Sequence, residues 1–144
     1  MIELTSEHRL AIDEHGEHDY PYECCGLLLG RFDNDGLKVT AETYVISNAR
    51  EEAAKRNRFL ITPDELLRGE RYAAEKNLEI VGFYHSHPDD VAVPSQYDLE
   101  HAWPTYSYIV MSVEKARTVG LRSWEMESDR SRFNEEEIVS EAGP

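Results

Sequence analysis

The chain has 144 residues, of which 40% are hydrophobic, and its 15 basic and 29 acidic side chains give a formal charge of −14 at pH 7. One domain of this length can bury a core without disulfides. The strong acidic excess argues against nucleic-acid and anionic-membrane partners, because binding to phosphate groups depends on clusters of Lys and Arg.

The beginning of the chain gives no sign of export. Residues 1–8 lack the basic-then-apolar pattern of a signal peptide, and no apolar run approaches the length of a membrane span. We therefore expect a cytoplasmic protein. A bridge between Cys24 and Cys25 is not expected, because neighbouring strand residues point to opposite faces. Small apolar packing is their simplest role, and a nucleophilic or metal-binding thiol is the alternative.

The first third of the chain predicts a helix followed by a β-hairpin. Thr5 and Ser6 can cap a helix that runs to about His18, before a proline interrupts it. The apolar run over 23–30 predicts a central strand. The Asp-Asn-Asp-Gly turn signal that follows leads into a second strand over 37–47.

A polar loop and a second helix come next. Residues 48–57 predict the loop, and a short strand is expected over 58–61. The helix has an explicit start, with Thr62 as its cap, Pro63 in its first turn and a glutamate three residues after the cap. It should run to about Asn77. The side chains that we expect it to bury are Leu66, Leu67, Ala73 and Ala74.

The segment 80–88, Ile-Val-Gly-Phe-Tyr-His-Ser-His-Pro, reads as a buried strand that ends in two histidines. His85 and His87 point the same way, because side chains two apart on a strand share a face. Pro88 should end the strand, since it lacks a backbone donor. Imidazole nitrogen suits zinc, and a carboxylate such as Asp98 would complete three protein ligands and leave a position for water.

Residues 95–98 predict the start of a short helix. Ser95 can be its N-cap, and Asp98 is the acid three residues later that completes a capping-box variant. Capping alone needs no chemistry. The two roles are compatible, because residues three apart on a first helical turn face similar directions.

The last part of the chain predicts two strands, over 106–113 and 119–126, joined by a short loop. Trp103 and Trp124 are most simply core aromatics, and a platform for substrate is the alternative. From about residue 128 we expect an acidic, partly mobile tail that can add a short edge strand or helix.

A glutamate far upstream in the sequence strengthens the interpretation of these residues as a metal site. The five that together fill an E…HxH…SxxD pattern are Glu23, His85, His87, Ser95 and Asp98. This pattern resembles the JAMM motif of the MPN-domain metalloproteases, and the order of the elements around it is similar to that family over most of the chain. The Glu-Cys-Cys-Gly-Leu-Leu segment also resembles the compact bacterial and archaeal members.

The resemblance implies a role for each motif residue. His85, His87 and Asp98 would hold one zinc ion per chain. Glu23 would take a proton from water at the metal and deliver it to the leaving amine, and Ser95 would help to stabilise the carbonyl oxygen as it gains charge. Without the rest of the motif, Glu23 would read as a solvated acid at a strand edge.

The resemblance also implies a fold and an activity. Strands and helices alternate irregularly, which fits an α/β fold, and the family has a mixed β-sheet sandwich flanked by helices, similar to the cytidine deaminases. We expect residues 1–144 to form a single MPN/JAMM domain. The implied enzyme is a zinc metalloprotease that hydrolyses a peptide or isopeptide bond, after the C-terminal Gly-Gly of a ubiquitin-like or sulfur-carrier protein.

Two other functions remain open. A non-catalytic MPN scaffold is one, although such relatives usually lack motif residues. A zinc hydrolase of small molecules or nucleobases is the other, but it would be expected to carry a Cys-x-x-Cys pair, which the sequence lacks. His101 reads as a rim or core histidine, or as a residue that contacts a metal ligand. Asp89 and Asp90 are predicted on an exposed loop, where they would favour basic residues beside the scissile bond if they line the cleft.

Overall fold

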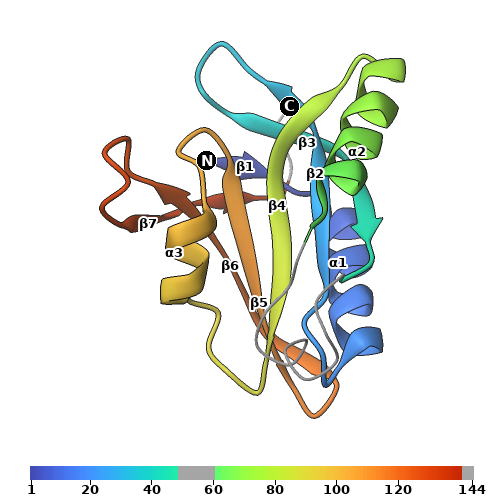
Figure 1. Ribbon diagram of the computed structural model, residues 1–144, viewed down its shortest axis with the longest axis vertical. Coiled ribbons are helices and arrows are strands. Elements are labelled where there is room, and N and C mark those ends of the chain that lie inside the picture. Colours follow the sequence, from blue (N-terminus) through green and yellow to red (C-terminus); the bar gives the residue numbers. More distant parts are fainter. Residues whose placement is uncertain (49–60, 141–144) are drawn as a thin grey trace.

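The computed structural model describes residues 1–48 and 61–140, which form an eight-stranded sheet with three helices (Figure 1). The helices are α1 (Ser6–Asp19), α2 (Pro63–Glu75) and α3 (Gln96–His101). The strands are β1 (Ile2–Glu3), β2 (Cys25–Phe32), β3 (Lys38–Ile46), β4 (Glu79–Pro88), β5 (Ser107–Glu114), β6 (Arg117–Met126), β7 (Phe133–Glu136) and β8 (Ile138–Val139).

The strand that carries the two histidines lies in the middle of the sheet. The strand order is β7-β6-β5-β4-β2-β3-β1-β8. β4 pairs antiparallel with β2 on one side and parallel with β5 on the other, so the sheet is mixed. This confirms the predicted α/β class, and the predicted hairpin is present as the antiparallel pair β2 and β3.

Different helices cover the two faces of the sheet. Because side chains alternate along each strand, neighbouring strand residues pack against different helices. On one face, Ile12 of α1 packs in a buried cluster with Leu28 and Tyr84. On the other, Ala73 of α2 packs with Leu27 and other apolar side chains. Figure 1 shows α1 behind the sheet and α3 in front of it. The alternation along β4 therefore turns the two histidines away from α1.

The buried side of α2 differs from the prediction. Ala73 is buried as expected and Leu66 is half-buried, but Leu67 and Ala74 are exposed and Gly69 is buried in their place. A Cβ at position 69 would lie 2.3 Å from Leu27 Cδ1, so a side chain there would require the end of the buried Leu27 side chain to shift. The helix has the predicted cap, since the Thr62 hydroxyl accepts from the Glu65 amide at 3.2 Å.

Other expectations have mixed outcomes. The prediction of Trp103 as a core residue is wrong, because its side chain is 61% exposed and Arg130 lies over the ring. Trp124 is half-buried. The free thiols of Cys24 and Cys25 are fully buried, as predicted. The expected strand over 58–61 falls almost entirely outside the described residues. Among the helices that the structure describes, none is both long enough and apolar enough to cross a membrane.

The acidic segment after residue 128 contributes strands to opposite ends of the sheet. β7 pairs with β6, and β8 pairs with β1. Between these ends lies a buried ion pair, in which Lys38 Nζ is 3.3 Å from Glu136 Oε2 and both side chains are at most 4% exposed. Ser123 Oγ donates to the second oxygen of Glu136 at 2.7 Å. The segment is therefore tied to the body of the sheet by buried polar contacts.

Replacing Glu136 by Gln is expected to lower the free energy of unfolding by about 2 kcal/mol, because Lys38 loses its buried carboxylate and keeps only the more exposed Glu125, at 2.9 Å. Burial alone would raise the pKa of Glu136, but the hydrogen bond from Ser123 and the charge of Lys38 contribute to lowering it. The carboxylate's stabilisation is therefore complete above its ordinary pKa of 4.5 and is lost as the pH falls through the lower folded value.

The neighbouring Glu135 provides the control for this experiment. It pairs with Arg122 at the surface, where a salt bridge contributes about 0–1 kcal/mol. Urea unfolding of Glu136→Gln and Glu135→Gln at pH 7 measures the difference. Equal losses in the two variants would contradict the structural role of the buried pair.

Candidate active site

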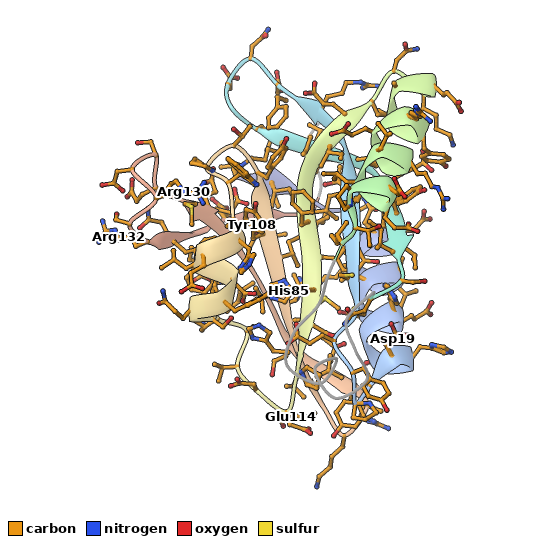
Figure 2. All side chains as sticks on the ribbon, in the orientation of Figure 1. Asp19, His85, Tyr108, Glu114, Arg130 and Arg132 are labelled. Atoms are coloured by element: carbon orange, nitrogen blue, oxygen red, sulfur yellow. The ribbon has the colours of Figure 1, made fainter. Side chains whose placement is uncertain are left out.

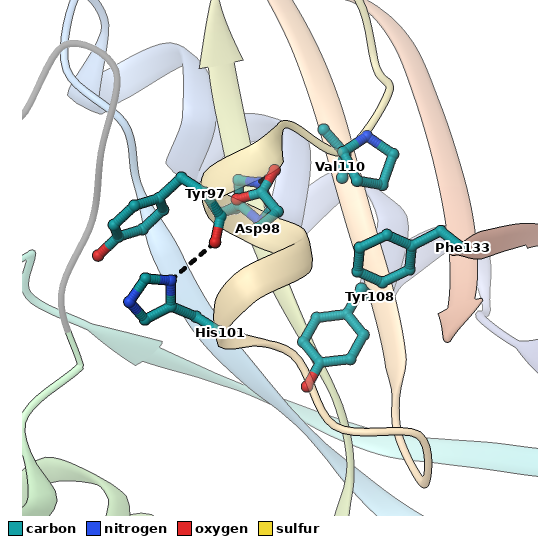
Figure 3. Close-up of a pocket in the computed structure, with 8 residues that line it drawn as sticks. Tyr97, Asp98, His101, Tyr108, Val110 and Phe133 are labelled. Atoms are coloured by element: carbon teal, nitrogen blue, oxygen red, sulfur yellow. Dashed lines mark hydrogen bonds and ion pairs between the residues drawn. The ribbon is translucent and has the colours of Figure 1, made fainter. Parts of the chain in front are cut away.

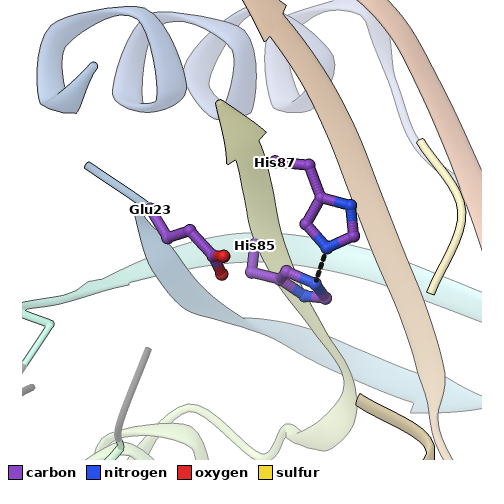
Figure 4. Close-up of side chains that lie close together, drawn as sticks. All are labelled: Glu23, His85 and His87. Atoms are coloured by element: carbon purple, nitrogen blue, oxygen red, sulfur yellow. Dashed lines mark hydrogen bonds between the residues drawn. The ribbon is translucent and has the colours of Figure 1, made fainter. Parts of the chain in front are cut away.

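The sheet brings Glu23 to the two histidines through its register. Cys25 on β2 is opposite His85 on β4. Continuing this antiparallel register two residues further places Glu23 across from His87, and opposite residues share a face of the sheet. The three side chains are each at most 7% exposed, and they converge at the same end of the two strands (Figure 4). The structure thus brings Glu23 and the two histidines, which are distant in the sequence, close together.

The second acid of the motif, Asp98, is positioned by the cap of α3. Ser95 Oγ accepts from the Asp98 amide at 3.2 Å, and Asp98 Oδ2 accepts from the Ser95 amide at 2.8 Å. This reciprocal capping box confirms the predicted N-cap and fixes the Asp98 carboxylate on the first turn. The side chain of Asp98 is 7% exposed and points to the histidines of β4.

Three donor atoms meet at one point between β4 and α3. The two imidazole Nε2 atoms of His85 and His87 lie 3.1 Å apart, and each lies 3.2 Å from Asp98 Oδ2. Ligand atoms of a tetrahedral zinc ion with bonds of about 2.0–2.1 Å are about 3.3 Å apart. The triangle therefore has nearly the dimensions of one face of such a site, and two imidazoles with one carboxylate are a typical donor set for a zinc that keeps an open position.

Glu23 is near this triangle without belonging to it. Its carboxylate and the ring nitrogens of His85 and His87 lie within 4.8 Å of one another, a looser group than the 3.1–3.2 Å triangle. The shorter distances make Asp98 the better candidate than Glu23 for the third ligand position. Burial raises the pKa of Glu23 to about 8; His87 opposes the rise, and the negative charges of Asp98 and Asp90 add to it. A carboxyl group with this proton affinity is suited to exchange protons near neutral pH.

A main-chain contact sets the tautomer of His87. Its Nδ1 lies 2.9 Å from the carbonyl oxygen of Val91, which can only accept. Nδ1 therefore carries the proton, and in the neutral ring Nε2 presents its lone pair to the triangle. Burial alone would lower the pKa of His87, but contacts with Asp98 and Val91 raise it in the metal-free site.

Contacts with the two histidines also keep the carboxyl group of Asp98 ionised. Burial alone would raise the pKa of its carboxyl, yet the charge and hydrogen bond of His85, together with hydrogen bonds from His87 and Ser95, hold that pKa well below its usual range. Asp98 is therefore a carboxylate at neutral pH, which is the protonation state that a metal ligand requires.

Ser86, between the two histidines, is a positioning residue that the sequence did not reveal. It points to the opposite face from the histidines, is fully buried, and its Oγ accepts from the Cys24 amide at 2.8 Å. Ser86 also donates its own amide to the Cys24 carbonyl at 3.2 Å. Because Cys24 directly follows Glu23, these two bonds fix the backbone that carries the glutamate. A serine on a strand carries no sequence signal for this role.

Replacing Ser86 by Ala is expected to lower kcat about 10-fold to 10²-fold, because Glu23 loses its anchor and small misplacements in an active site are costly. The free energy of unfolding should fall by about 1–3 kcal/mol, since the Cys24 amide is left buried without its side-chain acceptor. Metal content should not change. The exposed Ser128→Ala is the control, and a Ser86→Ala protein with the kcat of the wild type would contradict the anchoring role.

Two hollows that share three lining residues lie on the α3 side of the site. The smaller is a cavity of about 30 Å³ that reaches His85 and Asp98, with Tyr108, Val110 and Phe133 among its walls (Figure 3). The larger is an aromatic groove of about 230 Å³, which shares Tyr97, His101 and Tyr108 with the small cavity. The remaining described residues that line the groove are Ile61, Leu66, Phe83 and Trp103.

His101 and the two loop aspartates have roles outside the metal triangle. The ring of His101 is exposed, stacks on Tyr97 and bonds to its carbonyl oxygen at 2.7 Å. It is thus a rim residue, one of the predicted alternatives. Asp89 and Asp90 are exposed as predicted. Asp89 accepts hydrogen bonds from the Tyr20 hydroxyl, and the Asp90 carbonyl accepts from Ser112.

The chain is similar to several known proteins over most of its length. The family of prokaryotic homologues of the JAB domain matches residues 5–127. A desampylase from Haloferax volcanii is 34% identical over 122 residues, which cover 81% of this chain and 84% of that protein. The solution structure of a Salinibacter ruber protein is 37% identical, with a TM-score of 0.78 and coverage of 97% of this chain and 92% of that one. A JAB1/MPN domain protein from Archaeoglobus fulgidus, 18% identical, shares the fold with a TM-score of 0.57 over 95% of this chain and 98% of that one.

Proposed function

The chain belongs to the prokaryotic JAB family of JAMM/MPN domains, and on this basis we propose that it is a zinc-dependent isopeptidase acting after the C-terminal Gly-Gly of a ubiquitin-like or sulfur-carrier protein. It is a hydrolase of the JAMM type. The observation that carries the zinc proposal is the triangle of His85, His87 and Asp98, with the buried carboxyl of Glu23 beside it.

Each residue has a task in this proposal. His85, His87 and Asp98 would hold the ion, which would supply Lewis acidity and make water a nucleophile near pH 7. Glu23 takes the proton of the attacking water and transfers it to the nitrogen of the leaving amine as the amide bond breaks. Ser95, at the start of α3, donates its hydroxyl to the carbonyl oxygen as that oxygen gains charge.

The small cavity supports the choice of Gly-Gly. At about 30 Å³ it has room for little more than a water molecule, and it directly adjoins His85 and Asp98. A space of this size beside the metal triangle leaves no room for a side chain next to the scissile bond, which favours glycine there. The wider aromatic groove beyond it can receive the residues that precede the two glycines.

The remaining parts of the proposal concern the chain as a whole. We infer that residues 1–144 form one MPN/JAMM domain, since β7 and β8 complete the sheet to which the site belongs. We also propose a cytoplasmic location, because Cys24 and Cys25 are free thiols.

The test is hydrolysis of a ubiquitin-like protein whose C-terminal Gly-Gly is joined to a lysine side chain. We expect cleavage at the second glycine, dependence on zinc, and no cleavage when that glycine is replaced by valine, because the cavity has no space for a β-branched side chain. A non-catalytic MPN scaffold would give a different result, because it would bind the conjugate and leave it intact.

A further inference from the structure

A separate cavity of about 380 Å³ lies on the other side of the motif, where α1 ends. The described residues that line it are His18, Asp19, Tyr20, Tyr22, Glu23, Ser47 and Asn48. It shares none of these residues with the aromatic groove or the small cavity. In Figure 2, Asp19 and Tyr108 lie on opposite sides of His85. The site is thus open toward two different hollows, and Glu23 belongs to this one.

We propose that this cavity binds the side of the substrate that bears the leaving amine, and that it is built for the side chain of a conjugated lysine. The inference rests on the proposed function, because it uses the proton transfer assigned to Glu23. Hydrolysis breaks the bond between the glycine carbonyl carbon and the lysine Nε. The carbon gains the hydroxyl group of water and the nitrogen gains the proton, so the nitrogen must leave on the side where Glu23 delivers that proton.

Glu23 connects the cavity to the chemistry. Its side chain is buried and lines the cavity. The acyl part of the substrate takes the opposite route, because the small cavity adjoins His85 and Asp98 on the α3 side. The scissile nitrogen therefore lies between the metal triangle and the α1 cavity.

The walls of the cavity suit a lysine. Tyr20 and Tyr22 supply aromatic rings against which four methylene groups can pack, and Asp19 adds a carboxylate that favours the amine once it is protonated. None of the described lining residues is a lysine or an arginine. Among the described lining residues, the ring of His18 contacts Asp19 at 3.2 Å, but no lysine or arginine competes for the two carboxylates, so a cationic amine is attracted.

Part of this wall is held in place before any substrate binds. The Tyr20 hydroxyl donates to both carboxylate oxygens of Asp89, at 2.8 and 2.7 Å. Asp89 is itself fixed through its amide, which donates to the Val113 carbonyl at 2.7 Å. His15 Nε2 lies 3.2 Å from Asp19 Oδ2. Tyr22, in contrast, is 38% exposed, so its ring can be removed without opening the core.

Two substrates with the same acyl part distinguish the contribution of this subsite from that of the rest of the site. The carrier's C-terminal glycine is joined either to the ε-amine of Nα-acetyl-lysine amide or to methylamine. Both leaving groups are alkyl amines, so the chemistry is matched, but methylamine lacks the chain that would contact Tyr22. The measured quantity is the ratio of kcat/KM for the lysine substrate to kcat/KM for the methylamine substrate.

We expect this ratio to fall about tenfold in Tyr22→Ala, chiefly through a higher KM for the lysine substrate. Tyr22→Phe, which keeps the ring, should retain the wild-type ratio. Val119→Ala, an exposed position on β6, is the control and should also retain it. An unchanged ratio in Tyr22→Ala would overturn the inference, even if the protein cleaves both substrates well.

A binding experiment tests the subsite without turnover. Nα-acetyl-lysine amide is titrated into the zinc-loaded wild-type protein while the ring resonances of Tyr20 and Tyr22 are followed by NMR. Saturable shifts that disappear in Tyr22→Ala support the subsite. If both substrates remain uncleaved but these shifts are seen, the proposed function fails and the lysine site stands; the absence of shifts overturns the lysine site.

Discussion

Replacing Glu23 by Gln is expected to lower kcat by about 10²–10⁴-fold while the protein keeps its metal ion. Gln has nearly the shape of Glu but cannot take up a proton, so the variant removes the proton transfer and little else. Glu23 lies outside the ligand triangle of 3.1–3.2 Å, and this is why metal content should not change. The measurement combines steady-state kinetics on an isopeptide substrate with elemental analysis of zinc.

Stability should move in the opposite direction from activity. Burial raises the pKa of Glu23 to about 8 from an ordinary value near 4.5, so the metal-free fold is destabilised by ionisation of this carboxyl as the pH rises through that interval. Gln removes that cost, and metal-free Glu23→Gln should be at least as stable as the wild type at pH 7. Glu100→Gln, on the exposed face of α3, is the kinetic control. A Glu23→Gln enzyme that cleaves as fast as the wild type would falsify the assignment of the general base.

Replacing Asp98 by Asn is expected to abolish zinc retention in dialysed protein and to bring hydrolysis below detection. The neutral amide keeps the size of the side chain and can still accept the Ser95 amide, so the cap of α3 survives. The variant loses only the negative charge that completes the donor set. The fall in metal affinity should exceed the about 10–100-fold that loss of a supporting partner costs in metal sites.

The control for this variant is Asp64→Asn, an exposed acid in the first turn of α2. It removes the same charge from the protein but lies outside the triangle, and it should retain wild-type zinc content and rate. Circular dichroism and urea unfolding check that both proteins are folded. Full zinc occupancy in Asp98→Asn would show that Asp98 is not a ligand.

Local sequence patterns predicted much of the site. The spacing of His85 and His87 places both rings on one face of any strand, and the spacing of Ser95 and Asp98 fits a capping box on any helix. Both features are present in the structure, because each depends on only a few neighbouring residues. The helix start at Thr62 was predictable for the same reason.

The contacts between distant segments were not predictable from the residues alone. Glu23 is across from His87 only because of the register between β2 and β4, and Ser86 is connected to Cys24 by that same pairing. A family resemblance brought Glu23 into the site, but it gave no signal for Ser86. Nor did the sequence indicate the cavity at the end of α1, whose lining residues come from separate segments.

Two errors in the prediction have a common cause. Burial was assigned by side-chain hydrophobicity, which favoured Leu67 over Gly69 and placed Trp103 in the core. In the structure, the end of the Leu27 side chain occupies the space where a Cβ at position 69 would lie. Glycine therefore lets α2 approach the sheet without a shift of Leu27. The exposed ring of Trp103 lines the aromatic groove beside the site. Shape complementarity between elements, which decides both positions, is not encoded in local periodicity.

The central claim is that His85, His87 and Asp98 hold one zinc ion that works with Glu23 to hydrolyse an isopeptide bond after Gly-Gly. The most direct test measures zinc per chain and cleavage of a lysine-linked ubiquitin-like protein on the same sample, before and after removal of the metal by a chelator. We expect one zinc ion per chain, cleavage after the second glycine, loss of activity on chelation and recovery when zinc is restored. Full activity in protein shown to be free of metal would contradict the account.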